Sequence, residues 1–506
     1  MSILSREPKI SASSTYDLVI IGGGIYGAML TYEASYRGLR TLLIERDDFG
    51  ENTSFNSLRI IHGGFRYLQN LDIGRLMESV EERRFFLKTF PQLVKPLPCI
   101  MPLYGNGLRR PTVLRLALLA YDILSRNRNQ GIAPNRKIPP GFVLNKAETR
   151  EVFPYVDMEG LMGGAIWCDA IVRDSQRLII EVLRLSTKYG ATVLNYVEAV
   201  QLLTNQKKVV SGIIAIDRES GESFEFKSNI VINACGPWCR DLAARFDRDE
   251  PALFRSMLAW NVLFDKKPFC EYGLAVVPKK PKGRTYFLLP WKEKIFAGTG
   301  HAQWLSNSKS PMPSLGEMEE FLDDLNMAVP ALKIKKEDIL RVFPGLQSAK
   351  KEGGTDFAVR DVIIDHSDHG GPKGFYSISG VKLTTARRVA EKTLTRLFPE
   401  KRILVFPVKD DSQSHQVTSR IRWDFDANWR PNGSDPEWKV ALSSLIEEES
   451  VLHLDDLILR RTTLWENPSR TVEIASILCK AFCWNEEKSE MEIGRLKEKL
   501  QYYKIH

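Results

Sequence analysis

The first 45 residues alternate between short apolar runs and glycine-rich turns. Residues 17–21 are mostly apolar and rich in β-branched side chains, which is typical of a strand buried on both faces of a parallel sheet. Residues 25–37 have the spacing of a helix, and Gly38 stands where a glycine ends many helices. Residues 41–45 form the next apolar run. The pattern therefore predicts a strand, a turn, a helix and a second strand within 29 residues.

The middle of the chain mixes helical and strand-like patterns. Charged side chains at helical spacing around apolar ones predict a solvent-facing helix over residues 71–90. Residues 209–216 and 224–234 predict a hairpin. Further strands are expected in a region that begins near Trp260, over residues 285–290 and 294–300.

Both ends of the chain differ from its middle. Residues 1–15 are polar, so we interpret them as a frayed tail without a signal sequence. Residues 432–436 (Asn-Gly-Ser-Asp-Pro) predict a turn-forming linker, and helices follow it. The last helix carries an apolar stripe formed by Ile493, Leu496, Leu500 and Tyr503. This pattern predicts a small all-α C-terminal domain.

The composition is that of a globular protein with a sizeable core, since 43% of the 506 residues are hydrophobic and 26% are charged. The net charge of +8 is mild for this length, which argues against a nucleic-acid binder and suits an anionic small substrate or an acidic membrane surface. The seven cysteines show no paired zinc-site spacing, so we predict no metal site and buried thiols in a reducing compartment. No apolar run approaches the roughly 18 residues of a membrane-spanning helix. We expect a cytoplasmic protein, either soluble or peripheral on the inner face of the membrane.

The predicted turn carries a dinucleotide fingerprint, Gly22-Gly-Gly24-Ile-Tyr-Gly27. In such a turn the first glycine permits the tight bend, the second lets backbone amides approach a pyrophosphate, and the third lets helix and strand pack closely. The helix N-terminus adds partial positive charge. Glu45 ends the second strand, where its carboxylate can accept hydrogen bonds from ribose hydroxyls. The segment therefore predicts a dinucleotide site, and the fingerprint alone leaves nicotinamide and flavin open.

The residues after the fingerprint favour flavin. Residues 53–67 (TSFNSLRIIHGGFRY) resemble the segment that follows the FAD fingerprint in FAD-dependent glycerol-3-phosphate dehydrogenases and oxidases, which are D-amino-acid-oxidase-like flavoproteins. Later landmarks of that family are matched in order by residues 190–197, 233–238, 290–291, 298–299, 382–385 and 453–462. The resemblance extends from about residue 17 to residue 462.

The resemblance implies an α/β fold with three parts, namely a Rossmann-type FAD-binding domain, an inserted antiparallel-sheet substrate domain and a small all-α C-terminal domain. The oxidoreductase region would span residues 16–404. Its FAD-binding segments would be about 16–68, 160–245 and 340–404, and its substrate-domain segments about 69–159 and 246–339. Residues 405–506 would form the helical C-terminal domain.

The same resemblance implies that FAD is the cofactor and indicates which residues hold it. The flavin would supply the redox chemistry while the protein orients it. The implied contacts are Gly22, Gly24, Gly27 and Glu45 for the pyrophosphate and ribose, Thr53, Ser54 and Ser57 beneath the flavin, Val197 through its backbone on the adenine side, Gly236 and Trp238 around the cofactor, and Lys382, Leu383 and Thr384 beside the pyrimidine end of the ring. His62 would orient the flavin loop rather than bond covalently to the ring.

On the substrate side, Arg66, Tyr67, Arg360 and Lys382 resemble the substrate-contacting residues of the family. A cationic site suits a polyol phosphate. The alternative for the Arg-Tyr pair is a surface element with a packing role. His301 is a candidate base, and its alternative is a structural histidine that forms hydrogen bonds.

The substrate side also departs from the family pattern. Gln347 stands where the family has an arginine, Asn261 where it has a histidine, and Arg59 where it has a lysine. Glutamine keeps hydrogen bonding but loses the charge, so the change would weaken recognition of a desolvated phosphate by roughly a few kcal/mol. The flavin residues match the family while the substrate residues are altered.

Arg109 to Lys137 form a basic stretch with leucines between the charges. This stretch could lie on anionic lipid and give a reduced flavin access to quinone. The alternative is a core-facing helix with solvated arginines. Quinone and oxygen both stay open as electron acceptors, and a homodimer stays open as well.

Three functions are consistent with the residues. The first is an FAD-dependent dehydrogenase of glycerol 3-phosphate or a related polyol phosphate. The second is a flavoenzyme of the same architecture that oxidises a different alcohol or an amine, and Gln347 and Asn261 favour it. The third is a flavin-binding protein without turnover.

Overall fold

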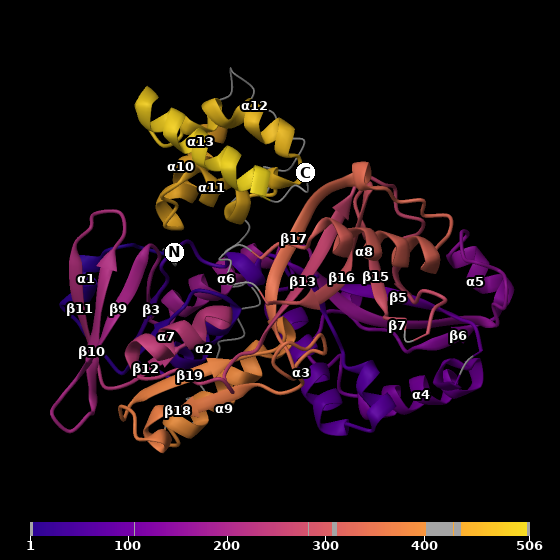
Figure 1. Ribbon diagram of the computed structural model, residues 1–506, viewed down its shortest axis with the longest axis horizontal. Coiled ribbons are helices and arrows are strands. Elements are labelled where there is room, and N and C mark those ends of the chain that lie inside the picture. Colours follow the sequence, from indigo (N-terminus) through magenta and orange to yellow (C-terminus); the bar gives the residue numbers. More distant parts are fainter. Residues whose placement is uncertain are drawn as a thin grey trace. The chain divides into compact units, whose positions relative to one another are not determined.

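In the computed structural model, whose elements are labelled in Figure 1, the chain divides into two compact units by its internal contacts. The structure describes residues 4–105, 107–281, 283–305, 311–400, 429 and 437–502. Of these, unit 1 contains 4–55, 174–256, 347–400 and 437–502, and unit 2 contains 56–173 and 257–346. Within the described ranges, no helix is long and apolar enough to cross a membrane.

Unit 1 is built on a six-stranded sheet with the order β18-β19-β12-β2-β3-β8. Its neighbouring strands are parallel except for β18, which runs antiparallel to β19. Every residue of the central strands β2 and β3 is buried, as their continuous apolar runs predict. The bounds are β2 Leu18–Ile21, β3 Thr41–Ile44, β8 Thr192–Leu194, β12 Val231–Asn233, β18 Val362–Asp365 and β19 Phe375–Ser379.

A second, four-stranded sheet of unit 1 packs against the first. Its order is β1-β11-β10-β9, and its pairs are antiparallel apart from β1 with β11. Val19 and Ile21 of β2 share one buried cluster with Ile213 and Phe226 of this second sheet, so the core lies between the two sheets. The bounds are β1 Thr15–Tyr16, β9 Val197–Thr204, β10 Val210–Asp217 and β11 Ser223–Ser228.

Helices complete unit 1. Helix α2 packs against both α6 and α9. The C-terminal helices α10 to α13, yellow in Figure 1, also belong to this unit. The bounds are α1 Pro8–Ala12, α2 Ile25–Tyr36, α6 Ser175–Lys188, α7 Cys239–Phe246, α9 Ala386–Leu397, α10 Glu437–Glu448, α11 Leu454–Asp456, α12 Pro468–Cys479 and α13 Glu486–Tyr502.

Unit 2 is built on a nine-stranded sheet with the order β17-β13-β16-β15-β14-β5-β7-β4, and β6 pairs with β7 outside this path. Its recorded pairs are antiparallel except that β14 runs parallel to β5. The bounds are β4 Ile60–Ile61, β5 Val94–Leu103, β6 Phe142–Leu144, β7 Gly163–Val172, β13 Ser256–Phe264, β14 Gly273–Val276, β15 Tyr286–Trp291, β16 Lys294–Gln303 and β17 Ile339–Ser348.

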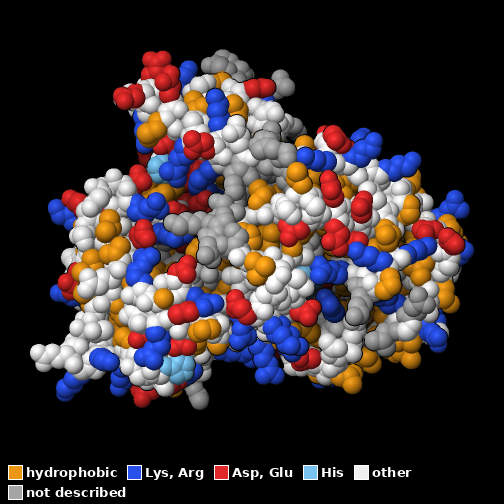
Figure 2. Space-filling view, viewed as in Figure 1, with side chains coloured by type: hydrophobic (Ala, Val, Ile, Leu, Met, Phe, Trp, Pro, Cys, Tyr) orange, Lys and Arg blue, Asp and Glu red, His pale blue; other side chains and the backbone are white. Residues whose placement is uncertain are grey.

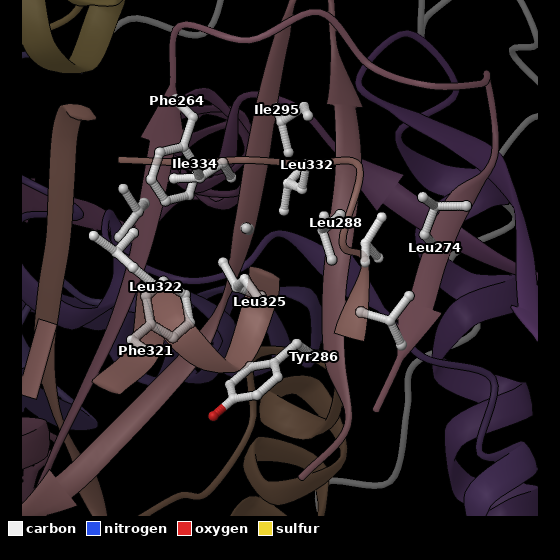
Figure 3. Packing of buried hydrophobic residues seen from close by; sticks show 14 of the residues in the cluster. Phe264, Leu274, Tyr286, Leu288, Ile295, Phe321, Leu322, Leu325, Leu332 and Ile334 are labelled. Carbon is white, nitrogen blue, oxygen red and sulfur yellow. The ribbon is translucent and has the colours of Figure 1, made fainter. Parts of the chain in front are cut away.

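Four helices cover the sheet of unit 2, namely α3 Ile73–Thr89, α4 Pro111–Leu124, α5 Lys146–Val152 and α8 Leu315–Ala328. Helix α8 starts with a capping box in which Ser314 and Glu317 bond to each other's backbone amides. Phe321 and Leu325 of α8 pack on the strand residues Leu288 and Ile295 (Figure 3). This apolar contact fixes α8 on one face of the sheet.

The structure confirms the predicted α/β class, the first strand–helix–strand unit and the helical C-terminal region. It also places strands over residues 286–291 and 294–303 and a helix over residues 73–89, close to the predicted ranges. That helix is only partly solvent-facing, because it buries Leu76, Phe86 and Arg83. The predicted linker 432–436 lies outside the described residues.

One prediction about local structure was wrong, and another was confirmed only in part. Residues 4–16 are ordered rather than frayed, because Leu4 is fully buried and its amide bonds to the carbonyl oxygen of Glu448 at 2.8 Å. The predicted hairpin is confirmed for β10 and β11, which pair antiparallel, but residues 224–234 are not one arm of it. They form β11 and β12, which belong to different sheets, since the chain turns between Ser228 and Val231.

The two units also divide the chain differently from the expected segments. Residues 56–68, 160–173 and 340–346, expected with the FAD-binding segments, lie in unit 2. Residues 246–256 lie in unit 1, and so do the described C-terminal residues.

Candidate functional site

The turn between β2 and α2 leaves no room for a side chain at Gly22 or Gly27. Gly22 has a φ of +112°, which only glycine adopts easily, and a Cβ on it would lie 2.7 Å from the carbonyl oxygen of Ala234. A Cβ on Gly27 would lie 1.8 Å from the carbonyl oxygen of Gly22, so helix and turn touch through backbone alone. Gly24 caps the N-terminus of α2. We call residues 22–27 the cradle, and its helix N-terminus suits a diphosphate.

Glu45 is held against the middle of the cradle. Its Oε2 accepts a hydrogen bond from the amide of Gly23 at 2.6 Å, and its Oε1 accepts one from the amide of Asp47 at 2.9 Å. Burial, followed by the charge of Asp47, raises the pKa of Glu45 to about 7. The carboxyl group therefore lies beside the glycine turn, where a ribose hydroxyl of a dinucleotide can bond to it.

Thr53 and Ser54 lie in the short 3-10 turn Asn52–Ser54. The Oγ of Ser54 accepts a hydrogen bond from the amide of Ile25 at 3.1 Å and so satisfies one of the free amides at the start of α2. Ser57 belongs to unit 2, and its buried Oγ has no hydrogen-bond partner among the described residues. Such a hydroxyl fits a residue that contacts a cofactor.

The loop around Lys382 is tied to α2 by Tyr26. The Tyr26 hydroxyl donates to the carbonyl oxygen of Lys382 at 2.8 Å, and the amide of Lys382 donates to the hydroxyl oxygen at 3.0 Å. A Cβ on Gly380 would lie 1.6 Å from Cζ of the Tyr26 ring, so only glycine fits beside it. The predicted residues 382–384 therefore lie beside the cradle helix, just before α9.

Val197 and Trp238 lie near the end of β3. The amide of Val197 donates to the carbonyl oxygen of Glu45 at 2.8 Å, so this amide is already used within the protein. The guanidinium of Arg46 lies 5.2 Å from the centre of the Trp238 ring. Gly236 has a φ of +55° and begins the 3-10 turn that ends with Trp238. The structure thus brings these predicted residues to the strand end that carries Glu45.

In unit 2, His62 pairs with the buried carboxylate of Asp169, with 3.1 Å between Nδ1 and Oδ2. The amide of Gly63 donates to Asp169 Oδ1 at 2.7 Å, and Trp167 Nε1 donates to Oδ2 at 3.2 Å. Burial opposes ionisation of Asp169, but the hydrogen bond and charge of His62, with the charge of Arg83, lower its pKa. The His62 side chain is 42% exposed. An ionised carboxylate thus orients a ring whose Nε2 can accept a proton.

The remaining predicted substrate residues divide between the units. Arg66 and Tyr67 lie in the 3-10 turn of residues 65–70 in unit 2, where Arg66 is exposed. His301 lies on β16 of the same unit, and its Nδ1 is 3.4 Å from the carbonyl oxygen of Thr299. Arg360 and Lys382 belong to unit 1 and are exposed.

Two of the altered positions have internal partners. Asn261 donates to the carbonyl oxygen of Asn56 at 2.8 Å and accepts a hydrogen bond from the Thr299 hydroxyl at 3.0 Å. Arg59 is buried against the rings of Trp291, Phe296 and Phe343, with its guanidinium carbon 5.1, 5.7 and 5.5 Å from their centres. Both residues therefore contribute to packing within unit 2. Gln347 lies half-buried near the end of β17.

Comparison with known proteins assigns the chain to a family. Residues 17–393 match the sequence profile of the family described as FAD dependent oxidoreductase. The chain belongs to this family. FAD is its cofactor, and the members are oxidoreductases. The glycine cradle and the Glu45 carboxylate fit such a cofactor.

Several proteins that are similar to this chain are named glycerol-3-phosphate dehydrogenases. A glycerol-3-phosphate dehydrogenase from Synechocystis sp. is 31% identical over 409 residues, which is 78% of this chain and 72% of the relative. An aerobic glycerol-3-phosphate dehydrogenase from Staphylococcus aureus is 31% identical over 398 residues, covering 77% and 69%. The solved glycerol-3-phosphate dehydrogenase from Bacillus halodurans complexed with FAD superposes with a TM-score of 0.72 at 20% identity, over 100% of this chain and 99% of that chain. At this identity the superposition demonstrates a common fold.

Two residues that bond to predicted site residues have no counterpart among the sequence predictions. Tyr26 occupies an unspecified position of the fingerprint, so no residue pattern singles it out. Asp169 is the one charged residue of β7, whose ten residues are all buried. A lone carboxylate in a buried strand needs a partner, and this signal could have identified it.

Proposed function

We propose that this FAD-dependent oxidoreductase oxidises glycerol 3-phosphate or a closely related polyol phosphate and passes the electrons to a quinone or another acceptor. The observation that carries the proposal is the 31% identity to two proteins named glycerol-3-phosphate dehydrogenases over more than two thirds of each of them. When bound, FAD accepts the hydride that leaves the alcohol carbon.

The residues of this chain would bind and orient the reactants. The N-terminus of α2 in the cradle would bind the diphosphate, and the Glu45 carboxylate would accept a ribose hydrogen bond. Arg66, Arg360 and Lys382 are exposed cations, which suits a phosphorylated substrate. Oxidation of an alcohol also requires a base that takes the hydroxyl proton.

We propose His62 as this base, in preference to His301. Asp169 bonds to Nδ1 of His62 and stabilises the imidazolium that forms when Nε2 takes a proton. The Nδ1 of His301 lies 3.4 Å from the carbonyl oxygen of Thr299, which is long for a hydrogen bond.

A different alcohol or an amine is the second candidate substrate, and Gln347 favours it. In the family that the chain resembles, an arginine stands at this position. Arginine would form a charged, two-pronged bond to phosphate, whereas glutamine forms a neutral one. A substrate without a phosphate group would not need that charge.

Reduction of the bound flavin tests the proposal. The purified yellow protein is mixed anaerobically with glycerol 3-phosphate, with glycerol as the matched unphosphorylated control, and with a panel of alcohols and amines. We expect glycerol 3-phosphate to bleach the visible flavin absorbance. Bleaching by another compound alone would establish the second candidate, and no bleaching by any compound would indicate a protein without turnover.

A variant at position 347 sharpens this test. Gln347→Arg should lower the apparent KM for glycerol 3-phosphate about tenfold or more, since a hydrogen bond to a charged group is worth roughly 1.5–3 kcal/mol. An unchanged KM would contradict the placement of Gln347 beside the phosphate.

The base is tested with a matched pair of histidine variants. His62→Asn should lower the rate of flavin reduction by roughly 100-fold or more, the usual contribution of a general base. His301→Asn should change it little. The reverse result would make His301 the base.

We also propose that α4 lets the protein bind peripherally to the cytoplasmic face of a membrane. Leu116, Leu119 and Ile123 point outward from α4 and are 69%, 58% and 64% exposed. Arg115 and Arg126 are exposed on the same helix and just after it. Figure 2 has the same view as Figure 1, and at the lower right, where Figure 1 labels α4, hydrophobic side chains lie among Lys and Arg. An outward apolar face with flanking arginines suits anionic lipid.

Sedimentation with lipid vesicles tests this surface. Vesicles that contain phosphatidylglycerol should bind the protein more strongly than neutral phosphatidylcholine vesicles. Leu119→Glu should reduce binding, and Leu315→Glu, at an exposed leucine of α8, is the control. Equal binding by both variants would exclude α4 as the contact.

The quinone acceptor and the homodimer also stay predictions. Quinone reduction assays would test the first, and light scattering would test the second.

A further inference from the structure

The loop that follows β3 is bonded to the cradle at both of its ends. At the start of the loop, the Glu45 side chain accepts the amide hydrogen bond of Gly23 at 2.6 Å. At its end, the amide of Gly50 donates to the carbonyl oxygen of Gly23 at 3.0 Å. Residues 45–50, which we call the 45–50 loop, therefore cannot shift without displacing the middle glycine of the cradle.

The centre of this loop is a fully buried carboxylate, Asp48. Arg461 forms a two-pronged pair with it, with Nη1 at 2.8 Å from Oδ2 and Nη2 at 2.9 Å from Oδ1. Arg460 donates to Oδ2 from its Nε, and Asn195 donates to Oδ1 at 3.0 Å. Burial opposes ionisation of Asp48, but the two arginines outweigh it and lower its pKa. Asp48 is thus held as a carboxylate by charges from a distant part of the sequence.

Both arginines belong to the C-terminal region, on the π-helical turn of residues 457–461 between α11 and α12. The same region also contacts the residue that follows the loop, and it reaches the loop indirectly through Tyr196. The Nζ of Lys499 on α13 lies 3.0 Å from Oε1 of Glu51. Asp456 accepts a hydrogen bond from the Tyr196 hydroxyl at 2.6 Å, and the amide of Tyr196 donates to the carbonyl oxygen of Asp47 at 3.0 Å.

The C-terminal region also contacts the other segment beside the cradle. Trp465 is buried and packs edge-on against Phe55, with 5.7 Å between the ring centres. Phe55 directly follows Ser54, whose hydroxyl accepts the first helical amide of α2. Two segments that flank the cradle therefore rest on the same group of C-terminal residues.

These contacts make the position of the 45–50 loop depend on the C-terminal region. A buried carboxylate that loses its arginines is strongly destabilised, so the loop would move to expose Asp48 to water. Glu45 and Gly23 would move with it, because they are bonded to each other and to the loop. The geometry of the cradle is then no longer suited to a ribose and a diphosphate.

We propose that the C-terminal helices are a functional part of the FAD site, in which Arg460 and Arg461 act as positioning residues that hold Asp48 and, through the 45–50 loop, set the positions of Glu45 and Gly23. Packing of the C-terminal helices and FAD binding are then coupled, and each favours the other by the same factor. The inference rests on the assignment of the cradle to FAD and is independent of the substrate.

FAD affinity of the full-length apoprotein tests the proposal. FAD is removed, and quenching of flavin fluorescence is followed as FAD is added back. Arg461→Gln should raise the Kd for FAD by about 5- to 150-fold, the usual range for coupled sites. Arg461→Lys keeps the charge but loses the two-pronged bond, so it should raise the Kd less.

Arg184→Gln is the matched control. Arg184 is also buried and also binds the C-terminal region, but its partners are Glu448 and Glu449 rather than the 45–50 loop. Both glutamine variants should lower the Tm, since both break buried ion pairs. Only Arg461→Gln should change the Kd for FAD. Equal Kd values for the wild type and both variants would overturn the proposal, because the arginine would then be merely structural.

Hydrogen exchange of the wild-type protein tests the reciprocal effect and keeps the proposal falsifiable if Arg461→Gln does not fold. FAD should slow exchange of the amides in residues 454–462. Unchanged exchange in the presence of bound FAD would overturn the coupling. A wild-type protein that binds no FAD would instead overturn the assignment of the cradle, and the proposal with it.

Discussion

The two units of this protein hold their helices in different ways. In unit 2, α8 packs on the nine-stranded sheet through carbon contacts such as those of Phe321 and Leu325 with Ile295 (Figure 3). In unit 1, the C-terminal helices meet the FAD-binding part through buried ions. Glu449 accepts two bonds from Arg177, at 2.6 and 2.7 Å, and one from Arg184 at 3.0 Å.

Apolar contacts and buried ion pairs differ in how strictly they fix the positions of the helices that they join. Apolar packing depends on the volume and area that are buried, and neighbouring side chains can adjust to a small change. A buried ion pair depends on both partners, and the loss of one leaves an uncompensated charge. Contact through ions therefore specifies one arrangement of the C-terminal helices, and it makes that arrangement sensitive to single changes of charge.

In unit 1, the contact that tolerates the least change is the backbone contact between Gly27 and Gly22 in the cradle. Gly27→Ala should yield protein without bound flavin, because the new Cβ would lie 1.8 Å from the carbonyl oxygen of Gly22. Gly494→Ala, at an exposed position of α13, is the control, since nothing lies within 4 Å of its Cβ position. Flavin absorbance of the purified proteins measures the effect. A yellow Gly27→Ala protein would contradict the assigned role of this turn.

The next largest effect is expected at the ion cluster. Glu449→Gln keeps the shape of the side chain but removes its charge, so the free energy of unfolding should fall by about 3–5 kcal/mol. Urea unfolding followed by circular dichroism measures this change. Glu447→Gln, at an exposed position in the last turn of α10, should change it by less than about 0.5 kcal/mol. Equal stability of the two variants would show that the buried charges do not specify the packing.

Alkaline pH should weaken the same region. Burial of the His453 ring opposes its protonation, but hydrogen bonds with Glu219 and Glu492 outweigh it and raise the pKa of His453 to about 9. The folded pKa lies above the ordinary value of about 6.5, so this stabilisation is complete below about pH 6.5 and is lost as the pH rises through 9. It is on the order of 2 kcal/mol, since Glu219 is partly exposed and its charge is screened.

A pH series of Tm values for the wild type and His453→Gln checks this prediction. The difference between the two proteins should be large near pH 6 and small above pH 9. A constant difference across this range would mean that the protonated ring does not stabilise the fold.

The smallest effect is expected in the apolar core of unit 2. Ile295→Val should lower the free energy of unfolding by only about 0.5–1.5 kcal/mol, since it removes one methyl group from a site that can partly adjust. The effect should also be independent of pH between 6 and 9. A loss as large as that of Glu449→Gln would remove the proposed difference between the two units.

Local patterns predicted the parts of the fold that depend on short stretches of chain. The apolar runs of β2 and β3, the glycine turn and the buried Leu496 and Leu500 of the α13 stripe each arise within one element, where spacing alone decides which side is buried. Tyr503 of that stripe lies outside the described residues. The N-terminal residues and the boundary between β11 and β12 were mispredicted, because distant partners decide them. Leu4 is ordered by Glu448, and β12 pairs with β2 and β19.

The site divides in the same way. Gly22, Gly27 and Glu45 could be found from sequence, because a diphosphate turn requires these residue types at a fixed spacing. The residue pairs that orient the predicted residues could not be found from sequence, because the two members of each pair are far apart in the chain. His62 and Asp169 are 107 residues apart, and Asp48 and Arg461 are 413 apart.

By itself, the sequence of this protein determined the glycine turn, the alternation of strands and helices, and the family to which the chain belongs, since all three are written in short segments with fixed spacing. Only the tertiary structure decided which charges meet in the interior. A buried carboxylate is stable only beside its cations, and the pairing of Asp48 with Arg460 and Arg461 arises when folding brings the two ends of the chain together.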